Sequence, residues 1–460
     1  MSKTLIAGAR VVDPSQGLDS VRNILVENGR IAALMPTAER PPADSVVDVA
    51  GLVVCPGFID LHVHLREPGG SASETIATGT RAAAIGGYTT VFCMPNTTPV
   101  CDSPITVRYI LDRANDAGLV RVVPIAAVTT GQEGELLSDM AALRDAGAGA
   151  ISDDGRPVTS SDVMRRAMEH AASLGITVFD HCEDLSLTAD GVMHEGAVSV
   201  RLGLKGIPRA SEAACVARDC LLSLLTGCRL HICHVSNVDS VEAIRHFKKR
   251  GAPVTAEVSP HHLTLTDAEV AGSDAASAYN THAKMKPPLC EDIDRRALIE
   301  ALEDGTIDCI ATDHAPHSPA SKATTFEVAP FGIIGMETAF PVLYTEFVRT
   351  GRWTLEFLID KMSCAPVRVM GELAQTRELG TLRPGAPADL VMLQLDQPRV
   401  LENSMLGSRS RNCPWLGRTL HARAVGTMAG GRWAWNDPAP RRAGGSPTAG
   451  AIQTPAGAAR

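Results

Sequence analysis

The stretch CPGFIDLHVHLREPG at residues 55–69 brings two histidines and an arginine, His62, His64 and Arg66, to the end of an apolar run. On a β-strand, residues two apart project from the same face, so these three side chains would point the same way. Neutral imidazoles bind metal ions, and a guanidinium binds carboxylate through paired hydrogen bonds. The spacing therefore predicts a metal site beside an anion site, although a single His-x-His pair is weak evidence.

Polar residues of the same kinds follow other short apolar runs. Asn96 follows YTTVFCMP, His181 follows ITVFD, His234 follows RLHIC, and Asp313 follows TIDCIAT. In a barrel, the carboxyl ends of all parallel strands open on one face, so residues far apart in the sequence would meet there. Histidine nitrogen and carboxylate oxygen are zinc ligands, and catalytic zinc sites keep a position open for water. The pattern thus favours a metal-dependent enzyme.

Helical patterns that end in glycine alternate with short β-rich runs through the middle of the chain. These helix-then-strand segments are 74–96, 161–184, 210–237, 238–262 and 295–317. Such segments are typical of βα units around a parallel sheet. Their number and continuity predict a (β/α)8 TIM-like barrel rather than a doubly wound sheet.

Hairpin-like β stretches at both ends of the chain predict a small β-sandwich domain formed by the N- and C-terminal segments. We expect its first part at residues 1–55, the metal-dependent hydrolase barrel at 56–370 and its second part at 371–436. Residues 437–460 are rich in Pro, Gly and Ala, which predicts a disordered tail.

Composition narrows the classes of partner. A net charge of −9 argues against nucleic acid or an anionic membrane as the main partner, and no apolar run is long enough to span a membrane. Twelve cysteines form no C-x-x-C pair, and the N-terminus has no secretory signal pattern. We therefore expect reduced, buried cysteines in a cytoplasmic protein with a small-molecule substrate.

Seven motifs together resemble one known family. In chain order they are PGFIDLHVHLREPG, GGYTTVFCMPNTTPV, ISDDGRPV, DHCED, HVS, EVSPHHL and DCIATDHAPH. They are similar to motifs of the dihydroorotases of the amidohydrolase superfamily, in the bacterial type I form, and the similarity runs from about residue 3 to 430. The resemblance implies a barrel with a flanking β-sandwich and two Zn²⁺ ions per subunit.

The resemblance also implies six metal ligands: His62, His64 and Asp313 for one zinc, His181 and His234 for the other, and Asp154 as the bridge. Many amidohydrolases use a carbamylated lysine as the bridge, where this chain has ISDDG. Asp153 is a competing candidate because adjacent strand residues face opposite sides. A plain turn is the structural alternative for this motif.

The implied reaction is the reversible zinc-dependent hydrolysis of the cyclic amide of (S)-dihydroorotate to N-carbamoyl-L-aspartate, in de novo UMP biosynthesis. Zinc lowers the pKa of bound water from about 15.7 to about 7, and a second metal ion helps to polarise the carbonyl. Asp313 would be the catalytic residue, because it can take a proton from the attacking water and pass it to the departing ring nitrogen.

The implied substrate contacts are His64, Arg66, Asn96, Lys286, His317, and the backbone at Phe331 and Gly332. Residues 314–329 could be a mobile lid or an ordinary surface loop. The chain departs from the family at KPPLC, where Lys286 stands in place of a substrate-contacting Asn and Cys290 in place of an Arg, and His282 stands where an Asn is common nearby.

Two other readings compete. A hydantoinase- or allantoinase-like amidohydrolase is expected to have a lysine in place of Asp154. A non-catalytic dihydroorotase-like partner of aspartate carbamoyltransferase is expected to have lost metal ligands, whereas this chain keeps all six. A homodimer, or an active complex with aspartate carbamoyltransferase, is compatible with the sequence.

Overall fold

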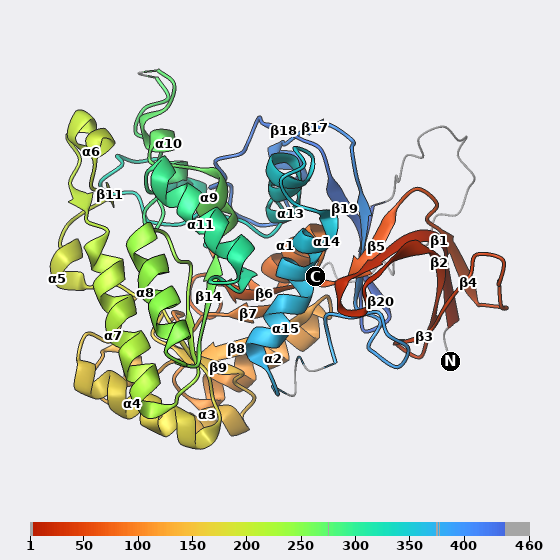
Figure 1. The fold of residues 1–460 in the computed structure, drawn as a ribbon, viewed down its shortest axis with the longest axis horizontal. Helices are drawn as coiled ribbons and strands as arrows, with labels where there is room; N and C mark the ends of the chain where they lie inside the picture. Colours follow the sequence, from red (N-terminus) through yellow and green to blue (C-terminus); the bar gives the residue numbers. More distant parts are fainter. Residues whose placement is uncertain (1–2, 275, 374–375, 377, 438–460) are drawn as a thin grey trace.

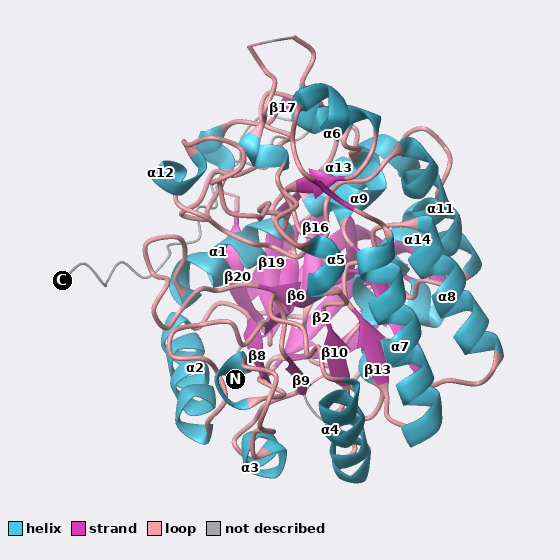
Figure 2. Ribbon diagram, turned by 90° about the vertical axis from the view of Figure 1, so that its left-hand side faces the viewer, coloured by secondary structure: helices cyan, strands magenta, loops and turns pink. Residues whose placement is uncertain are grey.

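The central feature of the fold is a parallel eight-stranded barrel surrounded by helices (Figures 1 and 2). The computed structural model describes residues 3–274, 276–373, 376 and 378–437. Strands follow chain order around the barrel, and a bridge between Val63 and His314 joins the first strand to the segment after the last. The (β/α)8 prediction is confirmed. The barrel strands are β6 (Phe58–Val63), β7 (Tyr88–Cys93), β8 (Arg121–Ala126), β9 (Ala150–Ser152), β10 (Val178–Asp180), β13 (Leu230–Ile232), β14 (Val254–Val258) and β15 (Cys309–Ile310).

Helices between successive strands form the outer layer. Four predicted helices end at glycines with φ between 68° and 94°, which are Gly87, Gly175, Gly227 and Gly305. Glycine adopts this left-handed conformation without a Cβ clash, so the chain can leave the helix and enter the next strand. The main outer helices are α1 (Ile76–Gly86), α2 (Pro104–Ala117), α3 (Met140–Asp145), α4 (Ser161–Leu174), α7 (Ala210–Thr226), α8 (Val238–Lys249), α11 (Asp292–Asp304), α13 (Ala339–Leu343), α14 (Leu355–Ile359) and α15 (Ala365–Met370).

Short elements lie in the loops above and beside the barrel. They are α5 (Leu185–Thr188), α6 (Ala197–Leu202), α9 (Pro260–Thr264), α10 (Ala268–Ala271) and α12 (Pro319–Lys322), with the strand pairs β11 (Met193–His194) and β12 (Gly206–Ile207), and β17 (Arg399–Val400) and β18 (Thr419–Leu420). Two helix–strand units of the barrel, α2–β8 and α3–β9, were not among the five predicted segments.

Apolar side chains fill the barrel interior below the strand ends. Ile59, Leu61, Phe92, Ile125 and Phe179 form part of this inner core, and all are fully buried. A larger apolar layer packs between strands and helices. Because apolar side chains fill the interior, the polar side chains gather above it, at the carboxyl ends of the strands.

Both ends of the chain build one small sheet beside the barrel, as predicted (Figure 1). A bridge between Arg30 and Pro387 brings the β3 edge back towards the segment before β16, so the sheet folds around its own core. The sheet docks on the barrel through Arg121, whose guanidinium lies 2.9 Å from the Asp389 carboxylate. Residues 438–460 of the predicted tail lie outside the described residues. The strands, in sheet order, are β20 (Arg432–Asn436), β19 (Arg423–Ala429), β16 (Leu390–Gln394), β5 (Val53–Pro56), β1 (Lys3–Asp13), β2 (Leu18–Glu27) and β3 (Arg30–Met35), with β4 (Ser45–Asp48) beside β1.

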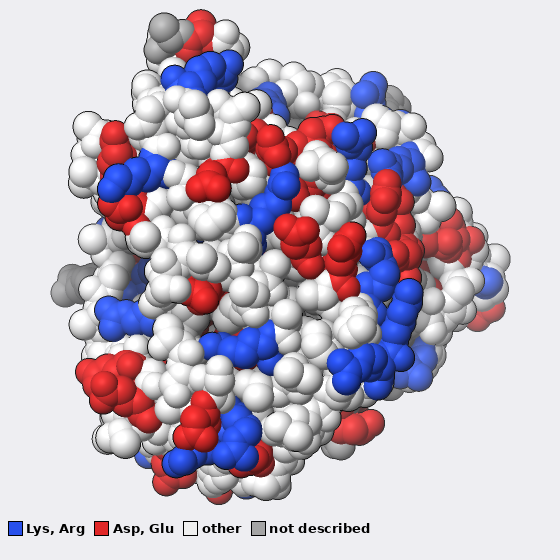
Figure 3. Space-filling model, turned by 60° about the vertical axis from the view of Figure 1, so that its left-hand side comes forward, with Lys and Arg blue, Asp and Glu red and all other residues white. Residues whose placement is uncertain are grey.

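Acidic and basic side chains are intermingled on the face shown in Figure 3. Of the described helices, none is long and apolar enough to cross a membrane.

Candidate metal centre and active site

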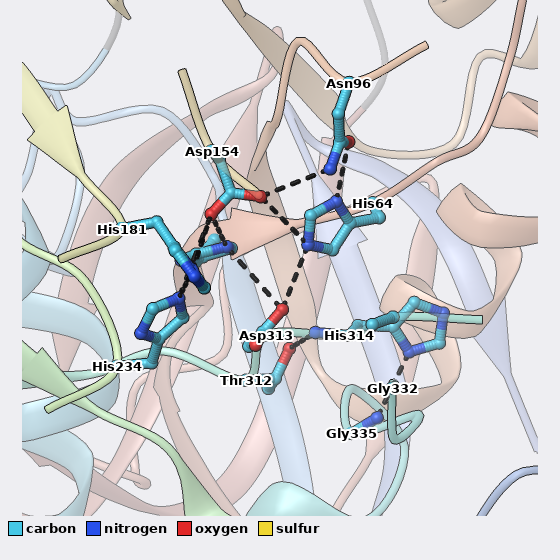
Figure 4. Close-up of polar contacts among 12 residues, drawn as sticks. His64, Asn96, Asp154, His181, His234, Thr312, Asp313, His314, Gly332 and Gly335 are labelled. Atoms are coloured by element: carbon cyan, nitrogen blue, oxygen red, sulfur yellow. Dashed lines mark hydrogen bonds and ion pairs between the residues drawn. The ribbon is translucent and has the colours of Figure 1, made fainter. Parts of the chain in front are cut away.

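Asp154 lies at the middle of a buried cluster of histidines at the carboxyl ends of the barrel strands (Figure 4). Its Oδ1 is 3.3 Å from His62 Nε2, 3.7 Å from His181 Nδ1 and 3.8 Å from His234 Nε2. Its Oδ2 is 3.6 Å from His64 Nε2. One carboxylate therefore faces four imidazoles that come from the ends of three strands, β6, β10 and β13.

Asp313 completes the cluster on the other side. Its Oδ1 lies 3.0 Å from His64 Nε2 and 3.6 Å from His62 Nε2. Asp313 has a φ of 45° and His234 a φ of 31°, so the backbone turns sharply where both residues leave their strands. Positive φ is uncommon for such residues and costs free energy, a feature often found at functional sites.

The cluster fits a metal ion. Ligand atoms of His62, His64 and Asp313 all lie within 4.8 Å of one another, and so do those of His62, Asp154 and His234. Among the described residues, His62 Nε2 and Asp154 Oδ1 face each other in the cluster and are buried without a hydrogen-bond partner. Buried polar atoms without partners cost free energy, and a cation coordinated by nitrogen and oxygen would satisfy them.

Hydrogen bonds behind the imidazoles fix how they face the cluster. His62 donates from Nδ1 to Glu257 Oε1 at 2.8 Å, and His64 donates from Nδ1 to Asn96 Oδ1 at 2.9 Å. Both Nε2 lone pairs are then directed at the cluster. The sequence analysis missed Glu257, which is 1% exposed. The signal in the sequence that could have indicated Glu257 is a carboxylate within the otherwise apolar strand VTAEV.

The two aspartates of ISDDG have different roles. Asp153 turns away from the cluster and accepts hydrogen bonds from the backbone N–H of Val128 and Thr129 and from the Thr129 hydroxyl. Asp154 faces the histidines and also accepts from Asn96 Nδ2 at 3.3 Å. Of the two candidates for the bridge, only Asp154 lies among the histidines.

The electrostatics of the cluster favour a cation. Burial would raise the pKa of Asp154 and Asp313, but the neighbouring imidazoles outweigh it and lower the pKa of each carboxyl below its ordinary value. Burial opposes protonation of His62 as well, yet Asp313 and Asp154 raise its pKa. Burial and the Arg66 guanidinium lower the pKa of His64, which keeps that imidazole neutral. A neutral imidazole and ionised carboxylates are the forms that bind metal.

Arg66 approaches the site by a different route from the one the spacing predicted. Strand β6 ends at Val63, and Arg66 has a φ of 59°, so it lies in the following turn rather than on a continuing strand face. Its Nε donates to Pro316 O at 3.2 Å, and its Nη2 lies 3.5 Å from His317 Nε2. The expected alternation was wrong at this residue because the REPG turn redirects the chain, although Arg66 still comes close to another predicted substrate contact.

The remaining predicted substrate contacts border this arginine. His317 donates from Nε2 to the backbone carbonyl of Phe331 at 2.7 Å. Gly332 has a φ of 150°, and a Cβ there would lie 2.6 Å from Ala315 O and 2.7 Å from the His317 ring, so only glycine fits. Arg66, His317 and the backbone at residues 331–332 thus lie together, whereas Asn96 uses its amide within the metal cluster.

Lys286 is held by an acidic residue. Its Nζ lies 2.8 Å from Glu183 Oε1 and 5.3 Å from the centre of the Phe331 ring. Cys290 is buried, and its thiol donates to Pro288 O at 3.4 Å. Neither departure from the family pattern places a group among the six candidate ligands.

Residues 314–329 form a packed loop. Lys322, only 3% exposed, donates from Nζ to Thr281 O and Lys284 O, and Lys284 donates in return to Phe326 O and Glu327 O. This reciprocal pair of lysines ties the loop to the segment before residue 285, so any lid movement would have to break four hydrogen bonds to backbone carbonyls.

Comparison with known proteins agrees with this architecture. Residues 51–240 match the protein family described as "Dihydro-orotase-like". The chain is 50% identical to the dihydroorotase of Geobacter sulfurreducens over 93% of its length and 98% of that protein, and 49% identical to that of Anaeromyxobacter dehalogenans over 93% and 96%.

Solved structures of similar fold include the L-hydantoinase of Arthrobacter aurescens, with a TM-score of 0.82 and 24% identity over 95% of this chain and 97% of that one. The D-hydantoinase of a Thermus species has a TM-score of 0.78 and 24% identity over 94% and 95%. The protein therefore has the barrel-and-sheet fold found in hydantoinases. Its identity of 47–50% to dihydroorotases makes it an enzyme of the cyclic-amide hydrolase class. Within that class, the chain belongs to the dihydroorotase family.

Proposed function

We propose that this enzyme catalyses the reversible hydrolysis of (S)-dihydroorotate to N-carbamoyl-L-aspartate in pyrimidine synthesis, with two zinc ions at the cluster. The observation that carries the proposal is the convergence of six candidate ligands on one buried site in a chain that is 50% identical to a dihydroorotase. In this assignment His62, His64 and Asp313 would hold one ion, His181 and His234 would hold the other, and Asp154 would be a ligand to both. Bound zinc supplies Lewis-acid activation of water and of a carbonyl.

Asp313 acts as the general base and then as the general acid. Its lowered pKa keeps it ionised at neutral pH, so it can accept a proton from the attacking water. The same carboxyl then delivers that proton to the ring nitrogen as the cyclic amide opens. Because a carboxylate of low pKa is a weak base, this role requires the transfer to be short and direct.

Arg66 and its neighbours bind the substrate's carboxylate. The guanidinium offers a two-pronged hydrogen-bond donor, and His317 with the backbone at residues 331–332 forms the adjoining wall. Burial, the largest effect, lowers the pKa of His317 to about 3, and the Arg66 charge acts in the same direction. His317 is therefore neutral and can both donate and accept a hydrogen bond.

The first test combines metal content with substrate choice. Zinc per subunit is counted in the purified enzyme, and hydrolysis of dihydroorotate is followed beside hydantoin and allantoin. We expect about two zinc ions and turnover of dihydroorotate alone. Asp154→Asn should lose zinc, whereas Asp153→Asn, its matched neighbour, should keep it. Turnover of hydantoin or allantoin instead would favour the related amidohydrolase reading, and absence of both zinc and turnover would favour a non-catalytic partner.

We also propose a cytoplasmic location for the enzyme and a metal site that one subunit completes. All twelve cysteines are free and buried, which suits a reducing cytoplasm. The six candidate ligands all come from one chain, so a homodimer or a complex with aspartate carbamoyltransferase would not be needed to complete the metal site.

A further inference from the structure

Lys286 and Glu183 form an ion pair directly behind the metal cluster. We propose that Lys286 is a positioning residue that holds the Glu183 carboxylate against His181, and thereby orients this imidazole for metal binding. The inference rests on the proposed metal site. It assigns a role to Glu183, which the ligand set does not include, and gives Lys286 a role other than direct contact with substrate.

Glu183 is placed to act on His181 from the side away from the cluster. Glu183 Oε2 lies 3.5 Å from His181 Nε2, while His181 Nδ1 lies 3.7 Å from Asp154 Oδ1 and 2.8 Å from His234 Nε2. A proton on Nε2 facing the carboxylate leaves the Nδ1 lone pair for a metal ion. A carboxylate behind a ligating histidine is a recurrent arrangement that fixes the tautomer and raises ligand basicity.

The Glu183 carboxylate is itself tethered from the opposite side. Its Oε1 accepts a hydrogen bond from the Thr188 hydroxyl at 2.7 Å and lies 2.8 Å from Lys286 Nζ. The Glu183 side chain is 7% exposed, so an unpaired charge there would carry a desolvation cost. Glu183 Oε2 is buried without a hydrogen-bond partner among the described residues, which leaves it available to His181.

Lys286 is suited to this tether by its surroundings. Its side chain is 26% exposed, and its ammonium lies between Glu183 and the Phe331 ring, 5.3 Å from the ring centre. The 2.8 Å separation of Lys286 Nζ from Glu183 Oε1 is that of an ion pair, so the lysine supplies the charge that compensates the buried carboxylate. A neutral amide at position 286 could not supply that charge.

Stepwise zinc binding to the metal-free, full-length enzyme tests the role of Lys286. The variants are Lys286→Met, Glu183→Gln, the double variant and the charge-retaining Lys286→Arg. Lys205→Met is the matched control, because Lys205 pairs with Asp190 at the surface, where both side chains are about two-thirds exposed. Binding is measured by calorimetry with a competing chelator, and cobalt absorption spectra report the geometry of each metal position.

We expect Lys286→Met and Glu183→Gln each to weaken one of the two zinc-binding steps by about 10- to 100-fold and to change one cobalt spectrum. The double variant should be no weaker than Glu183→Gln alone, because the lysine acts through the glutamate. Lys286→Arg should restore binding to within a few-fold, and Lys205→Met should match the wild type. Extra zinc should recover the kcat that Lys286→Met loses at limiting zinc.

Two results would overturn the inference while leaving the proposed reaction intact. One is Lys286→Met with both zinc affinities and both cobalt spectra unchanged but a raised KM for dihydroorotate, which would make Lys286 a direct substrate contact. The other is additive losses in the double variant, which would make the two residues independent. A wild-type enzyme that binds no zinc would overturn both the inference and the proposed function.

Discussion

Glu257→Gln tests how the barrel orients the proposed metal ligands, because it removes the carboxylate charge while a glutamine can still form both hydrogen bonds. Glu257 Oε1 accepts from His62 Nδ1 at 2.8 Å, and Oε2 accepts from His231 Nε2 at 3.0 Å. A glutamine can keep its oxygen on His62 and turn its amide to His231. His231 then changes tautomer and donates from Nδ1 to the Thr255 hydroxyl, which lies 2.8 Å away.

The cost of this change follows from what is lost. A hydrogen bond to a charged group contributes roughly 1.5–3 kcal/mol and a neutral one about 0.5–1.5 kcal/mol, so the difference is about 1–1.5 kcal/mol. At about 1.4 kcal/mol for each factor of ten, the affinity for zinc bound through His62 should fall roughly 5- to 12-fold. Competition with a chelator measures this directly in the folded enzyme.

A matched control separates this effect from a loss of stability. Asp389→Asn changes another buried carboxylate, which pairs with Arg121 where the small sheet meets the barrel. It should lower the midpoint of thermal unfolding and leave zinc affinity unchanged. The reasoning is refuted if Glu257→Gln binds zinc as tightly as the wild type. Unfolding of that variant would equally refute the claim that a glutamine can satisfy both histidines.

Three further outcomes are expected. Arg66→Lys keeps the charge but loses the two-pronged donor, so KM for dihydroorotate should rise roughly 10-fold or more with zinc content unchanged; an unaltered KM would contradict carboxylate binding by Arg66. Burial, followed by the charge of Lys284, lowers the pKa of Lys322 to about 7, so between pH 7 and about 10 the unfolded chain binds the extra proton. Stability of the wild type relative to Lys322→Met should therefore rise with pH, by up to about 1.4 kcal/mol per pH unit, and parallel thermal-unfolding profiles would contradict this. All twelve cysteines are buried, and burial raises the pKa of thiols such as Cys93, to about 12, so a thiol reagent should modify none in the folded enzyme and twelve after denaturation.

Much of the architecture was predictable because local signals and the fold agree. Glycines at 87, 175, 227 and 305 end helices in the left-handed conformation that the sequence pattern suggested. The α2–β8 unit was missed, although Ser103 caps α2 by accepting from Thr106 N–H and Pro104 begins the helix. This Ser-Pro pair is the local signal that marks the start of the helix.

Some features of the site can be predicted from residue type, whereas others depend on how the chain packs. His62, His181 and His234 were predictable because polar residues at strand ends of a barrel meet on one face. The exact course of the chain at Arg66 was not, because a turn with positive φ replaces the alternation of a strand. Similarly, strand alternation alone does not tell which of Asp153 and Asp154 faces the histidines, and only the family resemblance favoured Asp154.

The groups behind the ligands were the hardest to predict, for a physical reason. Glu257 on β14 supports His62 on β6, and Asn96 after β7 supports His64 after β6, so each partnership exists only once the barrel has brought separate strands together. A carboxylate within an apolar run can be predicted from the sequence to be buried, but the residue that it contacts cannot. The candidate ligands could therefore be predicted from residue type, whereas their orientation depends on how the barrel strands pack together. A substitution that shifts one strand against another should change the orientation of the ligands through these hydrogen bonds.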